Sequence, residues 1–197
     1  MLPAQLPYDF GQSGARPGTL RDFLASQHMT RALDPRGTNN LTAAACRRLP
    51  PPPLVFDSAV LGGSALGDDV APDPPIFGVE LGGATLRQLS VSPPLAGAHP
   101  HFHGAAFNAL LVGHRRWALV PPARAQFVPQ PALKYWAALR YGPRGVDAAA
   151  DALDEASTAA PWMDAVQRPG EVLYVPADWQ HATISLADSV AVAVEFV

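Results

Sequence analysis

Three of the six histidines in the chain stand at alternate positions within five residues, at His99, His101 and His103. In an extended strand, residues two apart project from the same face, so the imidazoles of His101 and His103 can converge on one point above a sheet. Neutral imidazole is the commonest metal ligand in proteins. The spacing therefore predicts a metal site, with His99 at its rim because Pro100 cannot donate to a strand ladder.

The later stretch from residue 170 to residue 181 offers a third ligand. An apolar run opens at Gly170 and closes at Pro176, and a short turn then leaves His181 at the start of a further strand. The predicted metal ligands and catalytic residues are therefore His101, His103 and His181. A structural interpretation stays open beside this one, because a single histidine on an apolar strand is more often a hydrogen-bonded core or surface residue than a ligand.

Composition narrows the class of protein. A chain of 197 residues with 48% hydrophobic and 16% charged residues suits one globular domain, and its 22 prolines and 16 glycines punctuate many short elements. The net charge of −3 and the lack of a long basic run argue against nucleic-acid binding. The single cysteine, Cys46, excludes an internal disulfide framework and a cysteine zinc cluster.

No stretch approaches the roughly 18 apolar residues of a membrane span, and the first residues lack the pattern of a signal peptide. We therefore expect a soluble protein without a membrane partner, cytoplasmic or nuclear by default. A missing true start would change that expectation, for instance to the lumen of the endoplasmic reticulum.

Residues 1–53 read as an N-terminal segment of extended and helical pieces that packs on a larger domain. Helices are expected over 19–27 and 40–48, and the proline run that follows reads as a rigid connector or as a polyproline ligand for a partner. From residue 54 to residue 197 the pattern changes to short apolar runs cut by Gly, Pro and Asp, which favours an antiparallel sandwich or barrel. The expected strands lie over 54–56, 76–81, 86–91, 107–112, 117–120, 172–175, 182–186 and 190–197. A helical insert is expected at about 131–157, with helices over 131–141 and 147–156.

Two separated blocks resemble a known family. His101-x-His103, the run from Asn108 to Pro122 and the run from Gly170 to His181 resemble the two-part motif of the cupin superfold, and within it the jumonji C (JmjC) family. The phrase His101-Phe-His-Gly and the tryptophan-bearing helical insert are most similar to the subgroup of jumonji domain-containing protein eight. The resemblance covers about residues 85–197.

This resemblance implies a mainly β fold, a double-stranded β-helix or jelly-roll barrel with a few peripheral helices. It also implies iron(II) held by two histidines and one carboxylate, with 2-oxoglutarate on the metal, and hydroxylation or demethylation through hydroxylation. His101 and His181 match the two histidine ligands. His103 stands at the carboxylate position, so zinc or another divalent metal stays open as an alternative to iron.

A second difference from the family pattern concerns the residue that binds the keto acid. Arg115 stands where the family often has a lysine that binds the distal carboxylate of 2-oxoglutarate, and Asn108 is the second expected cofactor contact. The alternative is that Arg115 is merely solvated.

The resemblance favours an Fe(II)/2-oxoglutarate-dependent oxygenase that hydroxylates a side chain of a protein or peptide substrate. Two alternatives stay open because the carboxylate and anchor positions are altered. One is a catalytically weak or inactive JmjC module that acts as a protein-interaction scaffold, and the other is a three-histidine cupin enzyme that uses another metal without 2-oxoglutarate. The sequence leaves the oligomeric state open, a homodimer included.

Overall fold

The fold was determined as a computed structural model of the 197-residue chain. The structure describes residues 5–6, 16–17, 22–25, 52, 54–58, 61, 67–68, 85–126, 128, 130–141 and 162–196. The expected strand over 76–81 and the expected helices over 40–48 and 147–156 lie outside these residues. Within the described part, no helix is both long and apolar enough to cross a membrane.

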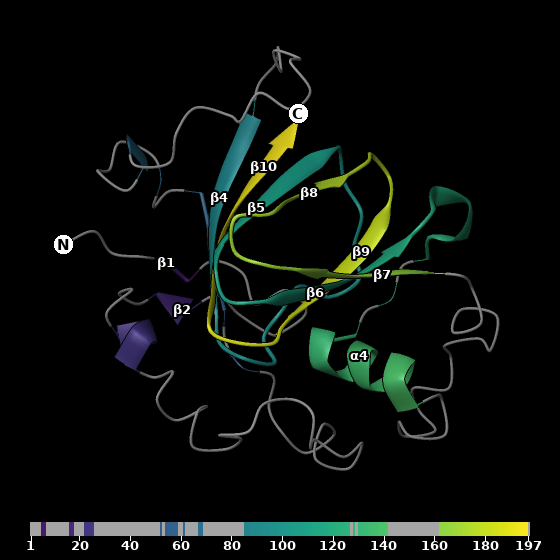
Figure 1. Ribbon diagram of the computed structural model, residues 1–197, viewed down its shortest axis with the longest axis horizontal. Helices are drawn as coiled ribbons and strands as arrows, with labels where there is room; N and C mark the ends of the chain where they lie inside the picture. Colours follow the sequence, from purple (N-terminus) through teal and green to yellow (C-terminus); the bar gives the residue numbers. More distant parts are fainter. Residues whose placement is uncertain are drawn as a thin grey trace.

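Two antiparallel sheets form the core of the molecule (Figure 1). The larger sheet has the order β3-β4-β10-β5-β8 and the smaller the order β7-β6-β9. The strands of the larger sheet are β3 (Val55–Asp57), β4 (Thr85–Ser92), β10 (Ser189–Phe196), β5 (Ala106–Val112) and β8 (Val172–Val175). Those of the smaller sheet are β7 (Met163–Gln167), β6 (Arg115–Val120) and β9 (Gln180–Ser185). A short pair, β1 (Gln5–Leu6) and β2 (Arg16–Pro17), precedes them.

This architecture confirms the predicted mainly β jelly-roll with few helices. Seven of the expected strands overlap β3, β4, β5, β6, β8, β9 and β10, whereas β7 was not predicted. β7 lies at an edge of its sheet and exposes Met163 and Val166. An edge strand of this kind lacks the buried apolar run by which the other strands were recognised.

One helix covers the smaller sheet. α4 (Ala132–Tyr141) falls inside the predicted insert, and its buried side chains pack in one cluster with Ala118 of β6 and with Ala182 and Ile184 of β9. Figure 1 shows α4 beside this sheet, on the side away from the larger one. Because successive residues of a strand point to opposite faces, His181 and Thr183 of β9 face the other way, toward the space between the sheets.

The second core cluster lies on the larger sheet. Val192 and Val194 of β10 pack there with Val55 of β3, Leu89 of β4 and Phe23. Residues 22–25 are helical, within the predicted helix over 19–27. Alternation along β10 leaves Ala193 and Glu195 on the opposite face, where they line a cavity between the sheets.

Candidate metal centre

The structure brings His101, His103 and His181 together in this cavity. One potential ligand atom from each lies within 4.8 Å of the others. The imidazole centroids are 4.2 Å apart for His101 and His181, 4.7 Å for His103 and His181, and 5.3 Å for His101 and His103. The geometry is that of three side chains that could share one ion, and their role as metal ligands stays a prediction.

Backbone hydrogen bonds hold the two ligand-bearing segments against each other. His101 and His181 form an isolated antiparallel bridge, with the His101 N–H donating to the carbonyl of His181 at 3.1 Å and the His181 N–H donating to that of His101 at 2.8 Å. The carbonyl of His103 accepts from the N–H of Asp178 at 2.9 Å, within the turn that leads to His181. The loop before β5 and the turn before β9 thus position the imidazoles jointly.

Each of the three imidazoles has its Nδ1 against a backbone carbonyl. His101 Nδ1 lies 2.6 Å from the carbonyl oxygen of His99, His103 Nδ1 lies 2.8 Å from that of Gly104, and His181 Nδ1 lies 2.9 Å from that of Trp179. A carbonyl oxygen can only accept, so Nδ1 carries the proton in each neutral ring and the Nε2 lone pair is left for a ligand. This tautomer is the one that a metal centre built on Nε2 requires.

Burial also keeps two of the imidazoles neutral. It lowers the pKa of His181 to about 4, and it lowers the pKa of His101 well below its usual range, with a further contribution from the neighbouring His181. Only a deprotonated ring nitrogen can bind a metal, so these low pKa values leave both side chains competent at neutral pH. The tautomers and the burial fit a divalent cation.

Arg115 lies in the same cavity, which has a volume of about 380 Å³. Its guanidinium donates to Ser90 Oγ at 2.9 Å and to Ser92 Oγ at 3.2 Å, both on β4 across from its own strand β6. Burial lowers the pKa of Arg115 to about 10, so it remains a cation at neutral pH. The alternative of a solvated Arg115 is wrong, because the residue is only 4% exposed.

No carboxylate within the described ranges forms an ion pair with Arg115, and its Nε has no hydrogen-bond partner there. A buried cation that is paired only with hydroxyl groups is costly and marks a place where an anion would be stabilised. Asn108 of β5 lines the same cavity, is 5% exposed and leaves its Oδ1 without a hydrogen-bond partner in that part of the chain. Both predicted cofactor contacts therefore face the cavity of the histidines.

Two further histidines of the described residues, His99 and His114, are not part of this group. His99 lines the cavity with its ring centroid 5.6 Å from that of His101, as expected of a rim residue, and His114 is exposed. Trp117 is a buried wall of the cavity, with its ring centroid 6.0 Å from that of His181. Trp179 packs against the same small apolar cluster as Trp117.

Four residues of the site were missed from the sequence. Ser90 and Ser92 solvate Arg115, and Ser92 Oγ lies 2.7 Å from Ser185 Oγ of the opposite sheet. Gln167 accepts from Trp117 Nε1 at 2.9 Å and donates to the Asn108 carbonyl at 2.7 Å, so it ties β6 to β5. Glu195, the fourth, lies beside His103. Polar residues alternating with Leu89 and Val91 were the available signal for the two serines.

Residues 89–197, more than half of the chain, match the JmjC domain family. The chain belongs to the JmjC domain family. The matched residues include every histidine of the centre, together with Arg115 and Asn108.

Relatives of this JmjC domain are distant. Human JmjC domain-containing protein 8 is 31% identical over 121 residues, which cover 61% of this chain and 41% of that protein. Lysine-specific demethylase JMJ21 of Arabidopsis thaliana is 31% identical over 133 residues, which cover 56% of this chain and 12% of that protein. The chain thus spans less than half the length of these relatives.

Among solved structures, the ribosomal oxygenase YcfD of Escherichia coli in complex with cobalt and succinic acid is similar with a TM-score of 0.50. The two sequences are 15% identical, and the alignment covers 97% of this chain and 38% of that one. At this identity the likeness concerns the fold, and it agrees with the jelly-roll arrangement of the two sheets.

Proposed function

We propose that this JmjC domain binds iron(II) through His101, His103 and His181 and 2-oxoglutarate through Arg115 and Asn108, and that it hydroxylates a side chain of a protein or peptide. The supporting observation is the pairing, within one cavity, of three converging imidazoles with a buried guanidinium that has no acidic partner among the described residues. A metal cation could bind to the imidazoles of this cavity, and an anionic ligand could pair with its guanidinium.

The guanidinium suits the distal carboxylate of a keto acid. Arg115 presents a rigid fork of donors, and its hydrogen bonds to Ser90 and Ser92 fix the direction in which that fork lies. Asn108 adds a side-chain amide from the neighbouring sheet. A dicarboxylate could therefore be held at one end by Arg115 and Asn108 while its other end reaches toward the histidines.

When bound, iron(II) and 2-oxoglutarate supply the activation of dioxygen that hydroxylation requires. The protein's own residues would orient the ligands and exclude water. The buried indole of Trp117 closes one wall, and Gln167 fixes its orientation through the bond to Nε1. Phe102 lines the cavity but is 49% exposed, so it marks the mouth where a side chain of a protein substrate would enter.

Lysine-specific demethylase JMJ21, one of the relatives, bears a name that refers to lysine as its target. This name supports a protein or peptide substrate for this chain.

Ligand binding tests the proposal before any substrate is known. In the presence of Mn²⁺, saturating 2-oxoglutarate should raise the Tm of the wild-type protein, because a ligand that binds only the folded state stabilises it. Arg115→Gln should abolish the shift. Arg116→Gln is the matched control, since Arg116 lies outward and pairs with Asp164. An unchanged shift in Arg115→Gln, or no shift in the wild-type protein, contradicts the proposed keto acid site.

Turnover is the second step. Wild-type protein with Fe(II), ascorbate and 2-oxoglutarate should release succinate, and it should release more when a peptide library contains the substrate. Bound metal and bound keto acid without succinate would favour the scaffold function. Metal binding without any 2-oxoglutarate binding would favour a three-histidine cupin enzyme of another class.

A further inference from the structure

Glu195 is an acidic residue on the inner face of the jelly-roll. Its strand β10 lies between β4 and β5, where Glu195 is opposite Leu86 on one side and Ala106 on the other. Its backbone is therefore held from both sides. Along this face β10 presents Ala193 and Glu195 to the cavity, and a carboxylate that is largely shielded from solvent requires a polar partner.

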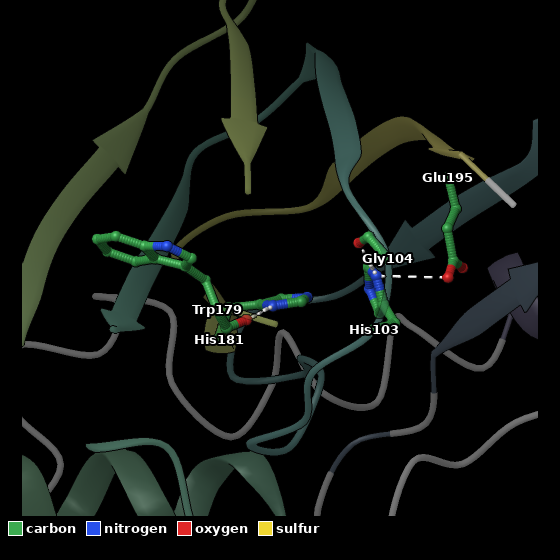
Figure 2. Close-up of polar contacts among 5 residues, drawn as sticks. All are labelled: His103, Gly104, Trp179, His181 and Glu195. Atoms are coloured by element: carbon green, nitrogen blue, oxygen red, sulfur yellow. Dashed lines mark hydrogen bonds and ion pairs between the residues drawn. The ribbon is translucent and has the colours of Figure 1, made fainter. Parts of the chain in front are cut away.

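The partner is the histidine that stands at the carboxylate position of the family. His103 Nδ1 lies 3.5 Å from Glu195 Oε1, and the side chains are 27% and 22% exposed, respectively. Figure 2 shows the His103 ring between the carboxylate of Glu195 on one side and the His181 ring on the other. The Nδ1–H thus faces both the Gly104 carbonyl and Glu195, while the ligand nitrogen is at the other end of the ring.

The close approach of the two segments depends on Gly104. A Cβ at this position would lie 2.7 Å from the carbonyl oxygen of Phe196, which is closer than a side chain tolerates. The Phe196 N–H donates to the carbonyl of Ala105 at 2.9 Å, and so the loop after His103 is docked on the end of β10. The backbone contacts between these two segments therefore place His103 beside Glu195.

The charges of the proposed site indicate a role for the contact between His103 and Glu195. Three neutral imidazoles leave the double positive charge of a metal uncompensated, and Arg115 adds a further positive charge. A dianionic keto acid would neutralise only two of these three charges. The single negative charge of Glu195 would supply the remainder, as a carboxylate ligand does in the family pattern of two histidines and one carboxylate.

We propose that Glu195 is the positioning residue of this centre. Its carboxylate, beside the Nδ1–H of His103, provides the negative charge that a carboxylate ligand would otherwise provide. This inference rests on the proposed metal site. Glu195 acts outside the ligand set, because the cluster of atoms within 4.8 Å comprises only His101, His103 and His181. The Gly104 carbonyl accepts from the Nδ1–H of His103 at 2.8 Å, and the Glu195 carboxylate lies beside it at 3.5 Å. Negative charge beside the far nitrogen of a ligating histidine makes its other nitrogen a stronger donor to the metal.

The test is the affinity of the full chain for Mn²⁺, measured by calorimetry without keto acid. Glu195→Gln keeps the size of the side chain and removes its charge, and it should weaken Mn²⁺ binding by roughly 10-fold to 100-fold. Glu171→Gln is the matched control, since Glu171 is exposed and pairs with Arg168, and it should leave the affinity unchanged. Far-UV circular dichroism of the metal-free variants checks that the fold is kept. Should Glu195→Gln fail to fold, Glu195→Asp, which withdraws the carboxylate by one methylene, should show a smaller loss.

Testing Glu195→Gln in a His103→Asp variant distinguishes an effect that depends on His103 from a general attraction between Glu195 and the metal ion. His103→Asp places a carboxylate in the ligand position, where it takes over the role assigned to Glu195. In that background, Glu195→Gln should cause no loss of Mn²⁺ affinity. An equal loss in both backgrounds, or none in the wild-type background, overturns the inference and leaves the three-histidine site standing. Absence of Mn²⁺ binding by the wild-type protein overturns both the inference and the proposed function.

Discussion

His101 and His181 exchange both backbone hydrogen bonds across an isolated bridge, although eighty residues separate them in the sequence. This pairing depends on main-chain atoms and not on the imidazoles. The two side chains project from it with their ring centroids 4.2 Å apart. The predicted site is therefore preorganised, because the hydrogen bonds of the fold place both candidate ligand side chains without the help of an ion.

The first prediction concerns the ligand set. His101→Ala should lower Mn²⁺ affinity at least 100-fold without unfolding the protein, because the bridge is formed by the backbone. His99→Ala is the matched control. The backbone carbonyl of residue 99 still accepts from His101 Nδ1, and the imidazole that is removed lies outside the cluster of candidate ligands. The Mn²⁺ affinity of this variant should therefore stay within about threefold of the wild-type value. Calorimetric titration measures both. Equal losses in the two variants would contradict the assigned ligands.

The second prediction concerns acid stability of the metal-free protein. The pKa of His181 is about 4 in the folded chain, against 6.5 in the unfolded one, because burial disfavours its charged form. Between pH 6.5 and pH 4, His181 binds a proton in the unfolded chain but not in the folded one. The free energy of unfolding is therefore unaffected by this group above pH 6.5 and falls as the pH drops toward 4. The loss is on the order of 3 kcal/mol at the end of that range.

Urea unfolding at several pH values measures this effect. The free energy of unfolding of the wild-type protein should fall more steeply between pH 6.5 and 4.5 than that of His181→Gln, whose side chain does not titrate. If both proteins show the same slope, His181 is not held neutral by burial.

The third prediction separates stability from ligand binding at Arg115. Arg115→Met replaces a buried cation by an apolar side chain of similar length, and such replacements are often neutral or stabilising. We expect the ligand-free Tm to be unchanged or to rise, while the thermal shift with 2-oxoglutarate disappears. Arg115→Lys keeps the charge but not the fork, and should retain a reduced shift. A large drop in ligand-free Tm for Arg115→Met would mean that Arg115 serves the fold rather than an anion.

The three histidines could be predicted from the sequence because their spacing and the later run from Gly170 to His181 are local patterns. The burial of Arg115 could not be predicted. Arg115 and Arg116 are neighbours on one strand and so point to opposite faces, and local composition does not say which face is inside. Only the structure shows Arg115 between the sheets and Arg116 over the ring of Trp136, with Cζ 5.4 Å from the centroid.

Glu195 was missed for a related reason. It follows five apolar residues near the end of the expected strand over 190–197, where a charged residue reads as exposed. Its proximity to His103 depends on the docking of the loop after His103 on β10, a contact between residues far apart in the sequence. The same holds for Ser90 and Ser92, which are recognised as partners of Arg115 only once β4 and β6 face each other.

The fourth prediction concerns Gly97, which fixes the distance between the histidine loop and β9. A Cβ there would lie 1.9 Å from the carbonyl oxygen of Thr183 and 2.9 Å from the Cα of Ile184, both backbone atoms that cannot move aside singly. The neighbouring bonds hold the strand in place, since the Thr183 N–H donates to the Ala98 carbonyl at 3.1 Å and Ala98 N–H donates to Thr183 Oγ1 at 3.0 Å. Gly97→Ala should therefore destabilise the fold by about 3 kcal/mol.

Gly170→Ala is the comparison, because a Cβ there meets no atom within 4 Å and the cost arises only from its φ of +84°. That conformation costs about 1–2 kcal/mol for a residue with a side chain. Urea unfolding should rank the two variants in this order, and only Gly97→Ala should also weaken Mn²⁺ binding, since displacement of the loop from β9 moves His101 away from His181. Equal Mn²⁺ affinities in the two variants would show that the loop reaches its position without this close contact.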